Sequence, residues 1–446
     1  MSLRWIGSRL FLLALFAGGC TGPDPRGRWA GEDLAPQYTD GGARLGCVGL
    51  ECRQVLDCAG GARSTLTGKV YDPSGKLPLY NATVYIPNAP LEPFPAGVSC
   101  ERCGEPTSGS PLVTALSGPD GTFVLENVPS GDDVPLVIQV GRWRRQVVIP
   151  VIEACSTTRV ADVNLTRLPR TQAEGDLPQM AIASGEADPF ECLLKKLGIA
   201  DTEFTSPTGG GRVHYYRENG IDTNPPAPPA STLWSNVSTL RNYDLVMLPC
   251  EGAENKKPLA ATQNLIDYTS LGGRVFTTHF SYAWIKFAQS PFPGTGRWDD
   301  RTDPPDPFMA SVDTTFPKGQ AFSSWLQSVG ASTALGQMPV HEPRHNVDAV
   351  TQVAQRWIFG NNANASDQQS VQHFTFNTPL DVPPAMQCGR VVFSDFHVSA
   401  NAVDTLQSTF PQTCKDEPLS SQEKALAFML FDLAACIQRD SDKPIP

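Results

Sequence analysis

Residues 243–248 read YDLVML, and a proline, a cysteine, a glutamate and a glycine follow at 249–252. This apolar run predicts a strand that is buried on both faces, as in a parallel sheet. A helical segment (258–271) comes next, and after Gly-Gly a second strand is expected at 274–278. Because strand and helix alternate, the stretch predicts an open α/β sheet.

The same alternation is found on both sides of this stretch. Residues 180–183 predict a short strand, and Asp188 can N-cap the helix that follows, with Pro189 at its first position. Near the C-terminus, residues 390–393 predict another strand.

The C-terminal region closes with a helix and contains one irregular segment. Ser420 and Glu423 have the spacing of a capping box, and an apolar helix follows them. Segment 290–370 is rich in loop-forming sequence and is interpreted as an insertion. Residues 179–446 therefore predict a C-terminal α/β domain with an open, mostly parallel sheet of the flavodoxin type.

Residues 64–168 have a different periodicity. Short runs with alternating apolar positions, such as Phe123 and Leu125, are separated by Pro-x-Gly turns. The pattern predicts an antiparallel β-sandwich, and the polar stretch 169–178 predicts a linker. The expected fold class is thus multidomain, with strands at 64–72, 81–87, 112–117, 122–127, 134–140 and 143–151 of the sandwich.

Residues 1–19 predict an export leader. Arg4 and Arg9 precede a short apolar core at 10–16, and small residues at 17–19 form a cleavage site. After this leader, no apolar run approaches the roughly 20 residues that span a bilayer.

Cys20 lies directly after the small residues, an arrangement that resembles a bacterial lipoprotein lipobox. The resemblance implies lipid attachment at Cys20, so the expected location is the cell envelope, with the membrane as a partner. Thr21 implies sorting to the outer membrane of a Gram-negative bacterium. Ala17 stands where that family usually has leucine, so ordinary secretion is the alternative. Residues 20–63 are interpreted as a cysteine-containing tether.

The cysteine count also indicates export, because an oxidising compartment favours disulfides. The six cysteines between residues 47 and 155 could close three bridges within the N-terminal unit. The remaining five predict two bridges and one free thiol. Cys100 and Cys103 form a C-x-x-C pair, for which structural bridging is favoured over redox chemistry or zinc. Besides Cys20, the cysteines are 47, 52, 58, 100, 103, 155, 192, 250, 388, 414 and 436.

The charge balance excludes one class of partner. The chain has 446 residues, 35 of them Lys or Arg and 46 Asp or Glu, so its formal net charge is −11. Nucleic-acid binding without sequence preference needs a basic surface. We therefore expect no nucleic-acid partner.

Polar side chains follow three of the predicted parallel strands. Cys250 and Glu251 follow the first, His279 the second, and Asp395 and His397 the third. Because sites in open α/β sheets gather at the carboxyl ends of the strands, we expect His279 and His397 to share a pocket. With Glu251 or Asp395 they could hold a divalent metal or act as acid and base. Imidazoles more than about 10 Å apart could not share a metal.

The segments YDLVMLPCEG, YTSLGGRVFTTHFS and CGRVVFSDFH, in this order, resemble the class I glutamine amidotransferase-like superfamily, and within it the ThuA-like branch. The resemblance covers about residues 178–437 and implies an amidotransferase-like sheet. In amidotransferases a nucleophilic cysteine stands where this chain has His279, so glutamine hydrolysis is not expected. His397 matches a C-terminal histidine of the ThuA-like pattern.

The N-terminal string TGKVYDPSGKLPLYNATVYIP, with TALSGPDGTFVLENVPSG, resembles the carboxypeptidase-regulatory-like (transthyretin-like) family. That resemblance implies a structural or adhesive β-sandwich without catalytic residues. A surface-protein ligand would fit such a module.

Three further motifs have an ordinary interpretation beside a functional one. Residues 341–345 match H-E-x-x-H, but a proline at 343 disrupts the helix that a zinc protease needs, so a solvated loop is expected. Tyr282 and Trp284 could stack on sugar rings, as could Trp357, although core packing is the commoner role. Cys250 resembles a nucleophile elbow without its first glycine, and a bridge or an inert thiol is the default.

Two functions therefore remain open. The first is a non-catalytic envelope protein that binds a ligand, with carbohydrate as a candidate, or that has a structural role. The second is an envelope hydrolase or sugar-modifying enzyme that uses His279 and His397, with Glu251 or Asp395 in support. A thiol redox protein that depends on Cys250 is a third hypothesis. The sequence assigns no cofactor and no defined metal site.

Overall fold

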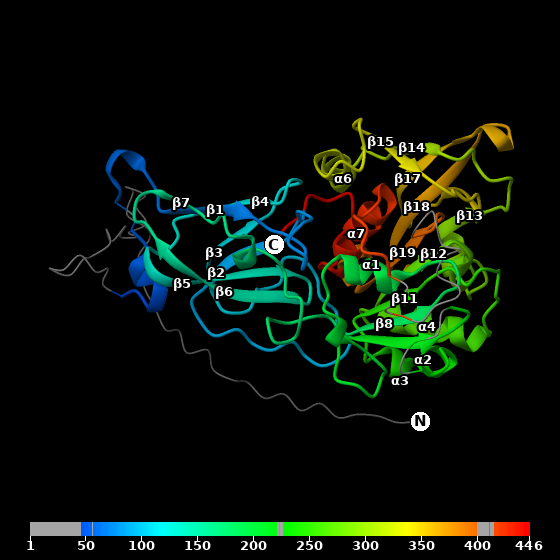
Figure 1. Ribbon diagram of the computed structural model, residues 1–446, viewed down its shortest axis with the longest axis horizontal. Coiled ribbons are helices and arrows are strands. Elements are labelled where there is room, and N and C mark those ends of the chain that lie inside the picture. The colour runs from blue at the N-terminus through cyan, green and yellow to red at the C-terminus, as the bar shows by residue number, and fades with distance from the viewer. Residues whose placement is uncertain (1–45, 56, 221–222, 224–225, 399–409, 411–413) are drawn as a thin grey trace, which may run out of the picture. The chain divides into compact units, whose positions relative to one another are not determined.

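The computed structural model describes residues 46–55, 57–220, 223, 226–398, 410 and 414–446 (Figure 1). The predicted leader and Cys20 lie outside these residues. The chain is a multidomain, mostly sheet protein with mixed and antiparallel sheets and few helices. None of the described helices is long and apolar enough to cross a membrane.

The largest sheet of the described chain has ten strands in the order β15-β14-β17-β18-β19-β12-β11-β8-β10-β9. From β19 to β9 the neighbouring strands are parallel, and from β15 to β19 they are antiparallel. The sheet is therefore mixed. Its strands are β8 (Met180–Ser184), β9 (Phe204–Thr205), β10 (Val213–Arg217), β11 (Leu245–Leu248), β12 (Arg274–Thr278), β14 (Phe308–Val312), β15 (Gln337–Val340), β17 (Gln355–Asn362), β18 (Gln368–Thr378) and β19 (Gly389–Ser394).

Helices pack against both faces of the parallel strands. Met180 and Ile182 of β8 belong to the same buried cluster as α1, α6 and α7, whereas Ala181 and Ala183 belong to a second cluster with α2 to α5. Successive side chains of a strand point to opposite faces, so the two clusters mark the two faces. The helices are α1 (Phe190–Lys196), α2 (Ser231–Trp234), α3 (Val237–Leu240), α4 (Leu259–Ser270), α5 (Ala283–Lys286), α6 (Pro317–Ser328) and α7 (Ser421–Ala434).

Most of the locally encoded elements agree with the sequence predictions. The strands expected at 180–183, 274–278 and 390–393 are β8, β12 and β19. The predicted capping box at the start of α7 is present, because Ser420 accepts from the Glu423 amide and the Glu423 carboxylate accepts from the Ser420 amide.

The prediction that 290–370 is a loop-rich insertion is wrong in its secondary structure. This segment and the residues just after it contain β14, β15, β17, β18 and α6, and the four strands extend the parallel sheet by antiparallel pairing. The small strands β13 (Gly296–Trp298) and β16 (Val347–Val350) pair with each other. The mostly parallel sheet that the sequence predicts is therefore found only from β19 to β9.

The N-terminal strands form two sheets, β4-β1-β7 and β3-β2-β5-β6. All strand pairs are antiparallel except β1 with β7. Phe123 and Leu125, which alternate with exposed positions in β4, share a buried cluster with Leu136 and Ile138 of β5. The strands are β1 (Thr65–Lys69), β2 (Thr83–Pro87), β3 (Pro111–Leu116), β4 (Thr122–Glu126), β5 (Gly131–Val140), β6 (Trp143–Ile152) and β7 (Thr157–Arg159).

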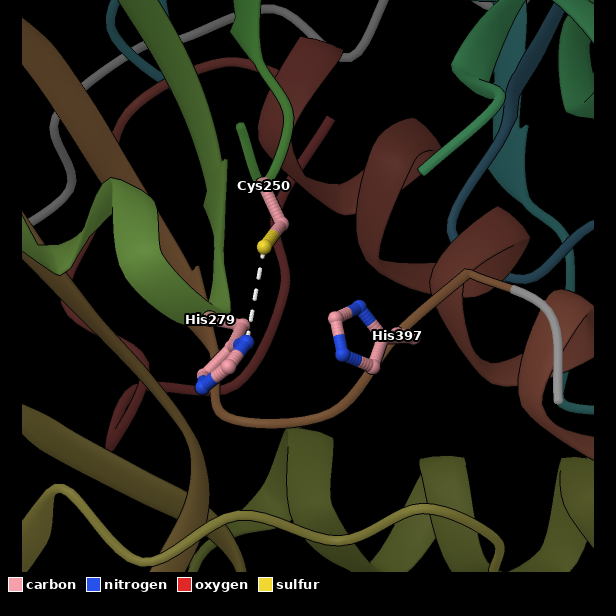
Figure 2. Close-up of side chains that lie close together, drawn as sticks. All are labelled: Cys250, His279 and His397. Carbon is pink, nitrogen blue, oxygen red and sulfur yellow. Dashed lines mark hydrogen bonds between the residues drawn. The ribbon is translucent and has the colours of Figure 1, made fainter. Parts of the chain in front are cut away.

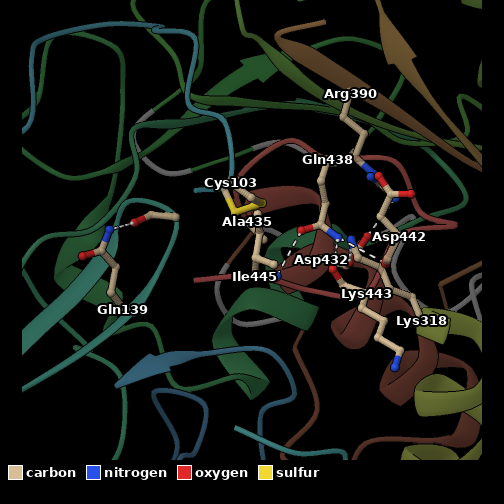
Figure 3. The surroundings of a disulfide bond; sticks show 12 residues. Cys103, Gln139, Lys318, Arg390, Asp432, Ala435, Gln438, Asp442, Lys443 and Ile445 are labelled. Carbon is tan, nitrogen blue, oxygen red and sulfur yellow. Dashed lines mark hydrogen bonds and ion pairs between the residues drawn. A yellow bond between two sulfur atoms is a disulfide. The ribbon is translucent and has the colours of Figure 1, made fainter. Parts of the chain in front are cut away.

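Disulfides connect residues that are far apart in the sequence. Cys58 pairs with Cys155, Cys192 with Cys414, Cys100 with Cys388 and Cys103 with Cys436. The prediction of three bridges confined to the N-terminal unit is therefore wrong, and so is the prediction of two bridges among the last five cysteines, where only Cys192–Cys414 is a bridge. Cys100 instead pairs with Cys388, which precedes β19, and Cys103 pairs with Cys436, which follows α7, because the fold brings the 99–104 loop to these elements. Figure 3 shows the surroundings of the Cys103 bridge.

The prediction of one free thiol among the last five cysteines is confirmed. The free cysteine is Cys250, which is fully buried.

A buried carboxyl in α1 provides a test of this packing. Burial raises the pKa of Glu191 from its ordinary 4.5 to about 7, and Asp188 adds to the increase. The native state then binds more protons than the unfolded state between these two values, so stability falls as the pH rises through this window. We expect the stability of Glu191→Gln relative to wild type to rise from pH 4.5 to pH 7 and then level off.

Chemical denaturation of both proteins at several pH values measures this difference. Glu51→Gln is a suitable control, because Glu51 is not a buried residue. A difference between Glu191→Gln and wild type that does not change with pH would contradict the prediction.

Candidate functional site

Three side chains meet at the carboxyl ends of the parallel strands (Figure 2). Cys250 lies two residues beyond β11, His279 directly follows β12, and His397 lies three residues beyond β19. The strands are neighbours, since β12 pairs with both β11 and β19. The structure thus places His279 and His397 in one pocket, as the sequence predicts.

The three groups are in close contact and buried. The Cys250 Sγ lies 3.4 Å from the His279 Nδ1, and the His279 and His397 ring centroids are 4.9 Å apart. The rings are nearly perpendicular, at 85°. One ligand atom from each residue lies within 4.8 Å of the others. The histidines are therefore well inside the separation that sharing a metal or a substrate requires.

Asp188 contacts this group through hydrogen bonds, and the sequence interpretation did not include it among the site residues. The predicted N-cap role is wrong, because α1 is preceded by Pro189 and has no side-chain cap. Instead the buried Asp188 carboxylate lies 3.2 Å from the His397 Nδ1 and accepts the Val398 amide at 2.7 Å. It also accepts hydrogen bonds from the Thr278 hydroxyl and the Cys250 amide.

Backbone geometry brings these segments together. A Cβ on Gly185 would lie 2.3 Å from the Cys250 carbonyl oxygen, so only glycine permits the turn after β8 to approach the turn after β11 so closely. His279 has a φ of +36°, which is unusual for a residue with a side chain. Such strained positions cluster at functional sites, where the surroundings hold the residue in place.

The two imidazoles carry different charges at neutral pH. Burial lowers the pKa of His279 to about 2, and the nearby His397 and Arg344 act in the same direction. Burial also disfavours a charge on His397, but Asp188 and Cys250 outweigh it and raise the pKa of His397 to about 10. The site therefore combines a neutral imidazole with a protonated one.

The group lies at the base of a pocket of about 670 Å³. Arg344 is the basic side chain on its wall. It makes an ion pair with Asp303 at 2.9 Å, and its Nη2 lies 3.4 Å from the His397 Nε2. The pocket is lined by Ala187, Cys250, Gly252, Glu254, His279, Phe280, Tyr282, Asp300, Asp303, Glu342, Arg344, Asn346 and His397.

Glu251 and Asp395, the two predicted supporting carboxylates, do not line this pocket. Glu251 makes an ion pair with Lys257 at 2.6 Å, and burial raises its pKa. Asp395 is fully buried and accepts the Asn346 amide at 2.7 Å; burial raises its pKa to about 8. Asp188 thus takes the position beside His397 that the sequence interpretation gives to Asp395 or Glu251.

The aromatic candidates separate into two groups. Tyr282 lines the pocket, and its hydroxyl donates to Glu254 at 2.6 Å. Trp284 and Trp357 are buried in the core, the former against Trp234 and the latter against Phe316. Neither tryptophan lines the pocket.

The H-E-x-x-H segment forms a loop, as the sequence predicts. His341 is exposed and paired with Asp306, whereas His345 is buried and paired with Asp348, so the two histidines face different partners. The segment contributes to the pocket through Glu342 and Arg344. No local pattern indicates this role.

The arrangement can support two kinds of chemistry. A thiol beside a charged imidazole that a carboxylate orients is typical of cysteine nucleophiles. One thiol and two imidazoles are also a ligand set that zinc uses in proteins. All three side chains are buried, each at most 5% exposed.

Comparisons with known proteins match solved structures only, all at low sequence identity. No family model and no curated protein matches the chain. Solved structures include a cytoplasmic protein from Salmonella typhimurium (12% identity, TM-score 0.32, 59% of this chain and 100% of the other). A ThuA-like protein from Bacteroides uniformis matches at 9% identity with a TM-score of 0.30, over 56% of this chain and 88% of the other. A ThuA-like protein from Parabacteroides merdae matches at 13% identity with a TM-score of 0.29, over 60% of this chain and 93% of the other. ThuA-like proteins are thus among its structural neighbours, at identities too low to transfer an activity.

Proposed function

We propose that this protein is a hydrolase of the bacterial cell envelope whose reaction takes place in the pocket above Cys250, His279 and His397. The observation that carries the proposal is the convergence of these three buried groups at the floor of an open pocket of about 670 Å³. Structural histidines at strand ends are satisfied by hydrogen bonds, but they do not require a neighbouring thiol and a second imidazole.

The roles of the residues follow from their contacts. Asp188 fixes the His397 ring through Nδ1, which leaves Nε2 to act in the reaction, either in proton transfer or as a ligand of a metal ion. Arg344 can stabilise negative charge that develops on a substrate oxygen, since its guanidinium lies beside His397. The acidic side chains on the wall, such as Asp300 and Glu342, favour polar groups of a substrate over anions.

The envelope location is proposed from the leader and from lipid attachment at Cys20. The disulfides among the described residues, such as Cys58–Cys155 and Cys192–Cys414, fit an oxidising compartment. Mass spectrometry of the mature N-terminal peptide would test the anchor: an unmodified peptide that begins at Cys20 or earlier would contradict it. From the sequence resemblances described above, we further propose that residues 64–168 form a carboxypeptidase-regulatory-like sandwich and that residues 179–446 form a ThuA-like α/β domain.

Hydrolysis can be tested with a panel of chromogenic esters, amides and glycosides. We expect His397→Ala to reduce kcat/KM by at least about 100-fold, because proton transfer by a positioned histidine contributes about 10²–10⁴-fold. His341→Ala is the matched control, since His341 is exposed and does not line the pocket. Equal rates in the two variants, or no turnover of any probe by the wild type, would contradict the hydrolase proposal.

A non-catalytic carbohydrate-binding role is the second candidate. It is favoured by Phe280 and Tyr282, whose rings lie on the pocket wall and could stack on a sugar. In that case calorimetry would detect oligosaccharide binding that Phe280→Ala weakens, while His397→Ala would leave it unchanged and no probe would be hydrolysed.

A further inference from the structure

In the described part of the chain, only Cys250, His279 and His397 form a group of three or more side chains that could hold a metal ion. We propose that these residues bind one zinc-class transition-metal ion and leave a coordination position open to the pocket. This inference deepens the proposed function, because it names the cofactor of the same site.

The separation of two of the three donor atoms fits such an ion. Zinc bonds of about 2.3 Å to sulfur and about 2.0–2.1 Å to nitrogen, at tetrahedral angles, place the two donors about 3.5 Å apart. The Cys250 Sγ and the His279 Nδ1 are 3.4 Å apart. The three side chains lie at the corners of a triangle (Figure 2), and one donor atom from each lies within 4.8 Å of the others.

The number of ligands indicates a catalytic rather than a purely structural centre. Structural zinc sites are closed by four protein ligands, whereas catalytic sites have three and keep one position for water or substrate. Here three protein ligands lie at the floor of a pocket that can supply the fourth ligand. An ion held there would lower the pKa of a bound water and provide a nucleophile for hydrolysis.

Asp188 provides the outer support that metal-binding histidines usually have. A ligating imidazole commonly donates its second N–H to a carboxylate, which fixes the tautomer and the ring orientation. Asp188 contacts the His397 Nδ1, and it is itself held by the Val398 amide and the Thr278 hydroxyl. The His397 Nε2 is then the atom left for the ion.

The state of Cys250 is consistent with coordination. Every other described cysteine is in a disulfide, whereas Cys250 remains a thiol in the same chain. A thiolate bound to zinc is held away from oxidation and exchange, because both reactions need an accessible thiolate.

The rival interpretation is a cysteine nucleophile activated by His397. That mechanism needs backbone N–H groups aimed at the developing oxyanion. The Cys250 amide is already used, since it donates to the Thr278 hydroxyl at 2.9 Å. A nucleophile would also need only one imidazole, which leaves His279 without a role. Both observations favour the metal.

The Arg344 side chain has to move away from His397 when the ion binds. Its Nη2 lies 3.4 Å from the His397 Nε2, and a guanidinium so close would oppose a bound cation. The side chain is partly exposed and already paired with Asp303, so it can move toward that carboxylate. Arg344→Ala should therefore bind the metal at least as tightly as the wild type.

The test uses the full-length protein, stripped with a chelator and reloaded with zinc or cobalt(II). We expect one metal ion per chain by elemental analysis. With cobalt we expect the d–d bands of a tetrahedral site and a sulfur-to-metal charge-transfer band. Cys250→Ser should abolish the charge-transfer band, and His279→Ala should lower the affinity at least about 100-fold. Asp188→Asn should lower it about 10- to 100-fold, and His341→Ala should leave it unchanged.

Two results would overturn the metal site: less than stoichiometric binding by the wild type, or equal binding by wild type and Cys250→Ser. The fate of the hydrolase proposal is separate. If the metal-free protein hydrolyses a probe and alkylation of Cys250 abolishes the activity, the metal proposal fails and the hydrolase stands. If cobalt binds with the expected spectrum and no probe is hydrolysed, the metal site stands and the hydrolase fails.

Discussion

Replacing Cys100 and Cys388 together with serine is expected to lower the free energy of unfolding by about 2–5 kcal/mol. This disulfide joins residues 288 positions apart, so the unfolded chain loses much conformational freedom when it is present. Cys103–Cys436, with a separation of 333, restrains almost the same loop. Removing the second bridge after the first should therefore cost more than removing either one alone.

The Cys58–Cys155 bridge is the matched comparison, because it closes a loop of only 97 positions. Chain entropy makes its loss about 1 kcal/mol less costly than the loss of Cys100–Cys388 when each loop is taken by itself, and the Cys103–Cys436 bridge, which restrains almost the same loop as Cys100–Cys388, should reduce that difference. Guanidinium denaturation without reductant measures the free energy of unfolding of the variants that lack Cys100–Cys388, Cys103–Cys436 or Cys58–Cys155. A Cys100→Ser/Cys388→Ser protein as stable as the wild type would show that the native contacts alone hold these segments.

The long-range bridges also illustrate what a single sequence can predict. The cysteine count indicates disulfides and one free thiol, but not which partners the fold brings together. Cys100 and Cys103 are far from Cys388 and Cys436 along the chain, so no spacing rule connects them.

The strands that could be predicted are those whose own residues and flanking turn residues indicate a buried strand. β11 and β12 are fully buried and bordered by proline or glycine, and the site lies at their carboxyl ends. In contrast, β18 contains Gln372, His373 and Thr375, all of them fully buried. Polar residues at core positions hide the strand period, so the sequence suggests a loop where the fold has a strand.

The candidate site was predictable only where a strand end specifies it. His279 and His397 were expected to meet and do so. Glu251 follows Cys250 directly, but it turns away to Lys257, because adjacent residues of an extended chain point to opposite sides. Asp188 and Arg344 come from loops, and only the tertiary fold brings them to His397.

A second large effect is expected at the buried charged cluster near the Cys103–Cys436 bridge (Figure 3). Arg390, at the start of β19, is 1% exposed and contacts Asp432 at 2.9 Å. Asp440 also contacts Arg390, and Lys318 lies 2.7 Å from Asp432. Two cations and two anions thus balance each other in the buried interior.

Arg390→Met keeps the volume approximately but removes one cation and leaves a net negative charge in the core. Breaking a buried ion pair in this way costs about 3–5 kcal/mol, because the remaining partner stays desolvated and uncompensated. The pKa of Asp440 is lowered: burial opposes its charge, but Arg390 and Lys318 outweigh that effect. We expect the variant to regain stability at acidic pH relative to the wild type, because protonation then removes the unpaired charge.

Urea denaturation measures the loss, and two further variants isolate its cause. Arg439→Met removes an arginine that is 59% exposed and paired with Asp442, so it should change stability by less than about 1 kcal/mol. Arg390→Met/Asp440→Asn restores neutrality in the core and should recover part of the lost stability. If the double variant is less stable than Arg390→Met, the loss comes from the missing hydrogen bonds of the guanidinium, and an unbalanced charge does not account for it.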